Sequence, residues 1–130
     1  MRSLTVGALS EVAVWLLAMV LFSSQALAHA FPIRSEPRVG WTIPHSPPRV
    51  KIWFDGELKP AVSTIAVYNS AKKKVDKGDG GVDPADPTLL EVALPKLPPG
   101  TYRVYWNVVA KDSERTEGDF PFTISGQPPP

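Results

Sequence analysis

The residues of this chain that could do chemistry are one histidine and two carboxylates. An Ala-Leu-Ala sequence at 26–28 forms a small-x-small cleavage site directly before His29. Cutting there makes His29 the first mature residue, which offers a metal two nitrogens, the α-amine and the imidazole. Asp112 and Glu114 stand two residues apart in a polar connection between two apolar stretches. Together these groups form a candidate ligand set of nitrogen and oxygen atoms.

The elements that must position this set are the first strand and the connection between the last two strands. If the connection is extended, Asp112 and Glu114 point to the same side because they are two residues apart. In an immunoglobulin-like sandwich this connection and the start of the first strand lie at the same end. That topology places His29 near both carboxylates and His45 far from them.

The candidate ligand set favours copper. Nitrogen and oxygen donors near one plane suit Cu(II), which also stands at the top of the divalent affinity order. Zinc is the main competitor and prefers a tetrahedral arrangement. Because the α-amine, with a pKa of about 7.7–8.0, must lose its proton to bind, we expect metal affinity to fall on acidification.

Composition limits the other possibilities. The chain has 130 residues and no cysteine, which excludes disulfides, thiolate metal sites and thiol nucleophiles. Its two methionines, Met1 and Met19, both precede the cleavage site. The net charge of +1 provides no electrostatic footprint for nucleic acid. Removal of residues 1–28 leaves enough chain for one domain.

Residues 1–28 have the pattern of a signal peptide. Arg2 precedes an apolar run at 12–22, which is shorter than the roughly 20 residues of a membrane-spanning helix. A polar break at 23–25 then leads to the cleavage site. An uncleaved anchor is the alternative, and the Ala-Leu-Ala site argues against it. We therefore expect secretion through a cleaved signal peptide, with the bacterial periplasm as the compartment.

The rest of the chain predicts an all-β domain over 29–125. Its 15 prolines, all beyond residue 28, disfavour long helices. Alternating apolar residues predict strands at 29–33 (an edge strand, because of Pro32), 49–54, 61–68, 88–94, 101–110 and 119–124. A polar hairpin connection is expected at 111–118 and a disordered proline-rich tail at 126–130. Six or seven short strands indicate a Greek-key sandwich or barrel.

The segment 69–87 is the part of the domain with the weakest strand pattern. It contains a run of three lysines at 72–74, which we interpret as a solvated turn rather than a partner site. It also contains four aspartates, whose spacing does not match an EF-hand calcium loop: Asp76, Asp79, Asp83 and Asp86.

The order of motifs along 29–125 resembles that of CopC-type periplasmic copper-resistance proteins. In the first half the matching pieces are His29-Ala30 after the cut, Ser35-x-Pro37-x-x-Gly40 and the strand 50–54. In the second half, residues 97–106 (LPPGTYRVYW) resemble the family's L-x-x-G-x-Y-x-V-x-W strand. Asp112 followed by residues 118–122 (GDFPF) resembles its ending, D-x-H and then G-x-F-x-F.

This resemblance implies a seven-stranded Greek-key β-barrel of cupredoxin or immunoglobulin-like type. It also implies Cu(II) held by the amino-terminal histidine, an aspartate and the histidine of an Asp-x-His pair. His29 and Asp112 match the first two positions, whereas Glu114 stands where the family has the second histidine. Since a carboxylate replaces an imidazole, we expect weaker Cu(II) binding or none. The methionine-rich Cu(I) site of some members cannot form here.

Three functions remain open at this point. The first is a secreted, non-catalytic copper-binding protein that serves copper homeostasis or resistance. We expect it to be a monomer, and the resemblance implies a copper-transporting membrane protein of the CopD type as its partner. The second is a CopC-like interaction module that has lost metal binding. The third, a copper oxidase such as a polysaccharide monooxygenase, would need a second histidine near the first. No residue set for hydrolytic or thiol catalysis is present.

Overall fold

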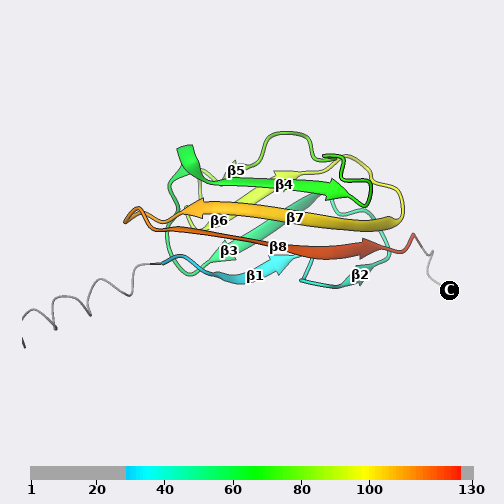
Figure 1. Cartoon of the computed structure of the whole chain (residues 1–130), viewed down its shortest axis with the longest axis horizontal. Helices are drawn as coiled ribbons and strands as arrows, with labels where there is room; N and C mark the ends of the chain where they lie inside the picture. The colour runs from blue at the N-terminus through cyan, green and yellow to red at the C-terminus, as the bar shows by residue number, and fades with distance from the viewer. Residues whose placement is uncertain (1–28, 127–130) are drawn as a thin grey trace, which may run out of the picture.

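The computed structural model describes residues 29–126 and shows two packed β-sheets (Figure 1). The first sheet has the order β1 (Pro32–Glu36), β3 (Arg49–Phe54), β6 (Leu89–Ala93), β5 (Gly81–Val82). The second has the order β2 (Thr42–Ile43), β8 (Arg115–Ile124), β7 (Gly100–Val109), β4 (Thr64–Asn69). Every pair is antiparallel except β2 with β8. The predicted signal peptide, 1–28, and tail residues 127–130 lie outside the described part.

The core lies between the two sheets and follows the alternation of the strands. In β3 the side chains of Val50, Ile52 and Phe54 are buried while their neighbours are partly exposed. The second sheet contributes the inward side chains of its long strands: Val67, Tyr102, Val104, Val108, Phe120, Phe122 and Ile124. The predicted all-β sandwich class is confirmed. Of the eight strands within residues 29–126, two are only two residues long.

Several predicted strand limits differ from the structure for identifiable reasons. The strand at 49–54 is confirmed, and β1 lies at a sheet edge as Pro32 predicted, although it starts later than residue 29. The predicted strand at 61–68 begins instead with a 3-10 turn over Pro60–Val62, where a proline occupies the start. β8 begins at Arg115 rather than at 119, because pairing with β7 continues through polar residues that show no apolar alternation.

The segment 69–87 is held by its aspartates. The Asp76 carboxylate, whose side chain is 1% exposed, accepts the backbone N–H groups of Val67 and Gly78, both at 2.8 Å. Asp79 accepts the N–H of Ala93 at 2.8 Å. These carboxylates therefore fix a turn-rich loop onto β4 and β6, and the loop includes the short strand β5.

The β7–β8 hairpin runs the length of the sandwich and defines its two ends (Figure 1). One end, here called the hairpin pole, carries the turn at 110–114 and the start of the described chain. At the opposite pole, the end of β8 lies beside β2, with Ile43 paired to Ile124. Within residues 29–126, no helix is long and apolar enough to cross a membrane.

Candidate metal centre at the hairpin pole

The segment that follows His29 is fixed to both sheets at the hairpin pole. The Thr116 hydroxyl on β8 donates a hydrogen bond of 2.7 Å to the carbonyl of Ala30, whose side chain is buried in the core. The Phe31 N–H donates to Oδ1 of Asp55 at 2.7 Å, and the Asp55 N–H donates to the Phe31 carbonyl at 2.9 Å. Residues 30 and 31 therefore have defined positions, and His29 is one residue away.

The turn that carries the two predicted carboxylates is tight rather than extended. The Ala110 N–H donates to the Glu114 carbonyl at 2.8 Å, and the Ser113 N–H donates to the Ala110 carbonyl at 2.8 Å. Ser113 has a φ of 80°, in the left-handed region. The condition under which strand alternation would place Asp112 and Glu114 on one side is therefore not met. Instead, Oδ1 of Asp112 accepts the Glu114 N–H at 3.3 Å.

The structure brings His29 and Glu114 together. Nδ1 of His29 lies 3.9 Å from Oε2 of Glu114, and the two side chains are 39% and 54% exposed. Nitrogen and oxygen ligands lie about 2.0–2.2 Å from an ion such as zinc, so two donors of one ion are at most about 4.4 Å apart. The separation of these two atoms lies within that limit. The Phe31 ring packs against the imidazole, with centroids 5.7 Å apart.

Asp112 does not join this pair as a third side-chain ligand in the structure. Across residues 29–126, histidine and acidic side chains form no group of three that could hold a metal ion. The Asp112 carboxylate is instead hydrogen-bonded to the backbone N–H of Glu114.

Two lysines border the turn. Nζ of Lys59 donates to the Ser113 hydroxyl at 2.6 Å, and Nζ of Lys111 lies 2.9 Å from a carboxylate oxygen of Glu57. The hydrogen bond and charge of Glu57 raise the pKa of Lys111, which keeps this ammonium protonated. Lys59 therefore brings an ammonium group to the turn, whereas the charge of Lys111 is paired with Glu57.

The other histidine lies at the opposite pole, as the topology predicted. His45 follows β2, and the neighbouring Pro44 carbonyl accepts the N–H of Gly126 at 3.1 Å. Glu114 immediately precedes β8 and Gly126 lies just beyond its end. At about 3.3 Å per residue, the ten residues of this strand separate the two poles by roughly 30 Å. His45 is thus excluded as a ligand beside His29.

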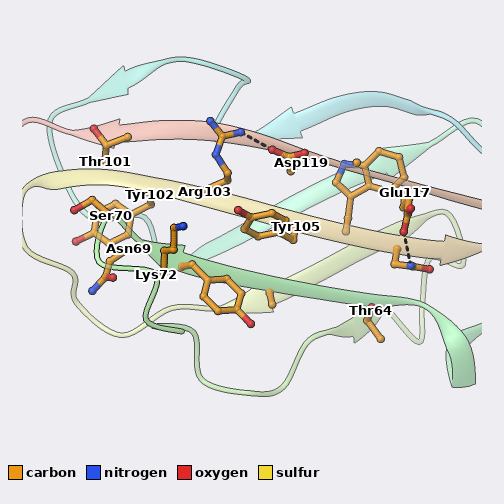
Figure 2. A pocket seen from close by; sticks show the side chains of 15 residues that line it. Thr64, Asn69, Ser70, Lys72, Thr101, Tyr102, Arg103, Tyr105, Glu117 and Asp119 are labelled. Atoms are coloured by element: carbon orange, nitrogen blue, oxygen red, sulfur yellow. Dashed lines mark hydrogen bonds and ion pairs between the residues drawn. The ribbon is translucent and has the colours of Figure 1, made fainter.

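A broad hollow of about 880 Å³ lies elsewhere, over the outer face of β4, β7 and β8 (Figure 2). None of the three predicted ligands lines it. Its floor carries Tyr105, whose ring packs edge-on against that of Tyr68 with centroids 5.5 Å apart. Arg103 pairs with Asp119, and Glu117 accepts a hydrogen bond from the Asn107 amide. Such a ladder of paired side chains is typical of a solvated sheet face.

Sequence reasoning missed the residues that hold the chain near His29. Neither Thr116 nor Asp55 was a candidate, because their partners are backbone groups 86 and 24 residues away. The position of Asp55 directly after an alternating strand was the only available signal, and it indicates a turn rather than a contact with the mature terminus.

Comparison with known proteins agrees with this architecture. CopC from Methylosinus trichosporium OB3b superposes with a TM-score of 0.66 at 31% identity, covering 75% of this chain and 94% of that one. PcoC, a methionine-rich copper resistance protein from Escherichia coli, gives 0.64 at 26% identity, covering 75% of this chain and all of that one. Both structures are matched over nearly their whole length, so this chain shares their complete fold.

Sequence comparison leads to the same family. The copper transport protein CutJ of Bacillus subtilis is 31% identical over 110 residues, which is 84% of this chain. The match spans only 20% of CutJ, so the chain corresponds to about a fifth of that relative. The CopC domain model matches residues 33–125, which is nearly all of the described sandwich. The chain is a member of the CopC domain family.

Proposed function

We propose that the mature protein is a periplasmic copper-binding protein of copper homeostasis or resistance that holds Cu(II) at its terminal histidine. The observation that carries the proposal is the 3.9 Å approach of the His29 imidazole to the Glu114 carboxylate at the hairpin pole. Similarity to known proteins supports copper as the metal, since CutJ is a copper transport protein and PcoC is a copper resistance protein.

The proposed site assigns a role to each group. The α-amine and imidazole of His29 form the chelate, and Glu114 provides the oxygen donor that faces it. Asp112 supplies a second carboxylate, which must turn away from the Glu114 N–H in order to bind directly. Copper suits such a nitrogen and oxygen set. Binding rather than catalysis is the proposed activity, because the similar proteins CutJ and PcoC are named for copper transport and copper resistance.

The test is a Cu(II) titration of two matched proteins. One begins at His29 and the other carries a single extra residue before it, which converts the α-amine into an amide. The proposal predicts a clear loss of affinity in the extended protein, because one of its two His29 nitrogens can no longer bind. Equal affinities would rule out the His29 chelate.

A second candidate function is a CopC-like interaction module without metal. It is favoured by the lack of a three-residue histidine and acidic cluster within the described residues, and by the lysines that border the turn. The same titration discriminates between the two functions. A protein that begins at His29 and still binds Cu(II) no better than an unstructured peptide starting with His-Ala would favour the module.

We further propose that the partner is a copper-transporting membrane protein, as the family resemblance implies. CutJ supports this proposal, because there a region similar to this chain forms a fifth of a single copper transport protein. Copper loss from the loaded protein to membrane vesicles that contain such a transporter, compared with vesicles that lack it, provides the measurement. Identical loss in both would contradict the proposal.

A further inference from the structure

We propose that Thr116 and Asp55 are positioning residues that hold His29 against Glu114. Their three hydrogen bonds to residues 30 and 31 are here called the terminal clamp. The inference rests on the proposed copper site and deepens it, since it concerns what aligns the donors rather than the donors themselves.

The terminal clamp fixes the chain from both layers of the sandwich. Asp55 directly follows β3 in the first sheet and exchanges two backbone-directed bonds with Phe31, of 2.7 and 2.9 Å. Thr116 is the second residue of β8 in the second sheet and bonds the carbonyl of Ala30 at 2.7 Å. Between these anchors the Ala30 side chain is only 1% exposed. Movement of either anchor would therefore displace the segment next to His29.

Thr116 connects the two halves of the proposed site. It lies two residues after Glu114, so the same stretch of chain carries both the Glu114 carboxylate and the hydroxyl that donates to the Ala30 carbonyl. The His29 imidazole can then move relative to that carbonyl only through the torsion angles of residues 29 and 30, including the side-chain angles of His29. A donor held in place before binding does not lose the conformational freedom of a loose chain end when the metal arrives.

The two anchors have different chemical requirements, which permits matched variants. Thr116→Val removes the hydroxyl at nearly constant shape, and Thr116→Ser retains it. Asp55→Ala removes the acceptor, whereas Asp55→Asn retains an oxygen acceptor and removes the negative charge. The Asp55 pair therefore separates positioning of the chain from long-range attraction between a carboxylate and a cation.

The experiment is a double-mutant cycle on protein that begins at His29, with Cu(II) affinity as the measurement. Glu114→Gln is introduced into wild type and into Thr116→Val. We expect Glu114→Gln to lower affinity about tenfold in wild type and less than about threefold in Thr116→Val, because a loose His29 no longer meets Glu114. Thr116→Ser should restore the larger factor. If Thr116→Val does not fold, the same cycle is made with Asp55→Ala against Asp55→Asn.

A readout without metal separates failure of the clamp from failure of copper binding. Nuclear Overhauser contacts from the His29 imidazole to the Glu114 side chain should be present in wild type and Thr116→Ser and lost in Thr116→Val. An equal cost of Glu114→Gln in both backgrounds, or contacts that persist in Thr116→Val, would overturn the terminal clamp. Equal Cu(II) affinity of the cleaved and extended proteins would overturn only the copper proposal, leaving the contacts to test the clamp.

Discussion

Replacement of Glu114 by histidine should strengthen copper binding. The family pattern has an imidazole at this position, and in the structure the carboxylate already lies 3.9 Å from Nδ1 of His29. An imidazole there would add a third nitrogen, a ligand type that suits copper. We expect Cu(II) affinity to rise at least about tenfold, or about 1.4 kcal/mol.

The same geometry predicts a small effect of Glu114→His on folding. Two unit charges about 4 Å apart in water attract by about 1 kcal/mol. Both side chains here are more than one-third exposed, so solvent screening makes the net contribution smaller. The free energy of unfolding should therefore change by less than about 1 kcal/mol, which shifts the melting temperature of a domain this size by less than about 8 °C.

Competition against a coloured Cu(II) chelator measures this affinity change, with thermal melting as the check on folding. Glu117→His is the matched control, because it adds a histidine at an exposed position three residues further along the chain, in β8. There Glu117 is hydrogen-bonded to Asn107 and not paired with His29. Affinity that does not rise in Glu114→His, or that rises equally in Glu117→His, would refute the placement of the site.

Three further outcomes are expected. Below the α-amine pKa of about 7.7–8.0, Cu(II) affinity should fall by about tenfold per pH unit for each proton that the metal displaces. Competition titrations at several pH values measure this slope, and a flat profile would exclude the amine as a ligand. Burial raises the pKa of Tyr102 in the folded protein, so its contribution to stability is complete below the unfolded pKa of about 10 and is lost as the pH rises through the folded pKa. In urea melts Tyr102→Phe should lack this alkaline loss while costing about 1 kcal/mol at neutral pH, since the phenol donates to the Pro98 carbonyl at 2.6 Å; an unchanged alkaline loss would point to another group. Gly118→Ala should cost about 1–3 kcal/mol, because its Cβ would lie 2.6 Å from the Trp106 ring, whereas Gly81→Ala meets nothing within 4 Å and is the control; equal melting midpoints would show that Trp106 moves aside freely.

The sequence predicted best those elements whose side chains alternate between core and solvent. The strand at 49–54 was predicted with its observed limits because Val50, Ile52 and Phe54 mark every inward position. The start of β8 was missed because residues 115–118 show no apolar alternation, although they pair with β7 next to the turn of the hairpin. The two-residue strand β2 was missed because its parallel pairing with β8 depends on a residue some 80 positions away.

The position of His29 in the candidate site could be predicted from the order of the strands, whereas the orientation of Asp112 and Glu114 could not be predicted from their spacing. The expectation that His29 meets the last hairpin followed from the order of strands in a sandwich, and the structure places its imidazole beside Glu114. The expected common side for Asp112 and Glu114 required an extended segment, whereas Ser113 turns the chain there with a positive φ. Hydrogen bonds to distant backbone carbonyls, such as that of Thr116, leave no mark in local sequence.

Native mass spectrometry of the exported protein tests copper binding at His29 in a single spectrum, which reports both the length of the chain that remains and the metal that it carries. We expect a mass that corresponds to loss of residues 1–28 with one copper ion bound. A chain that begins at any residue other than His29, or one that begins at His29 and stays free of copper when the metal is supplied, would contradict it.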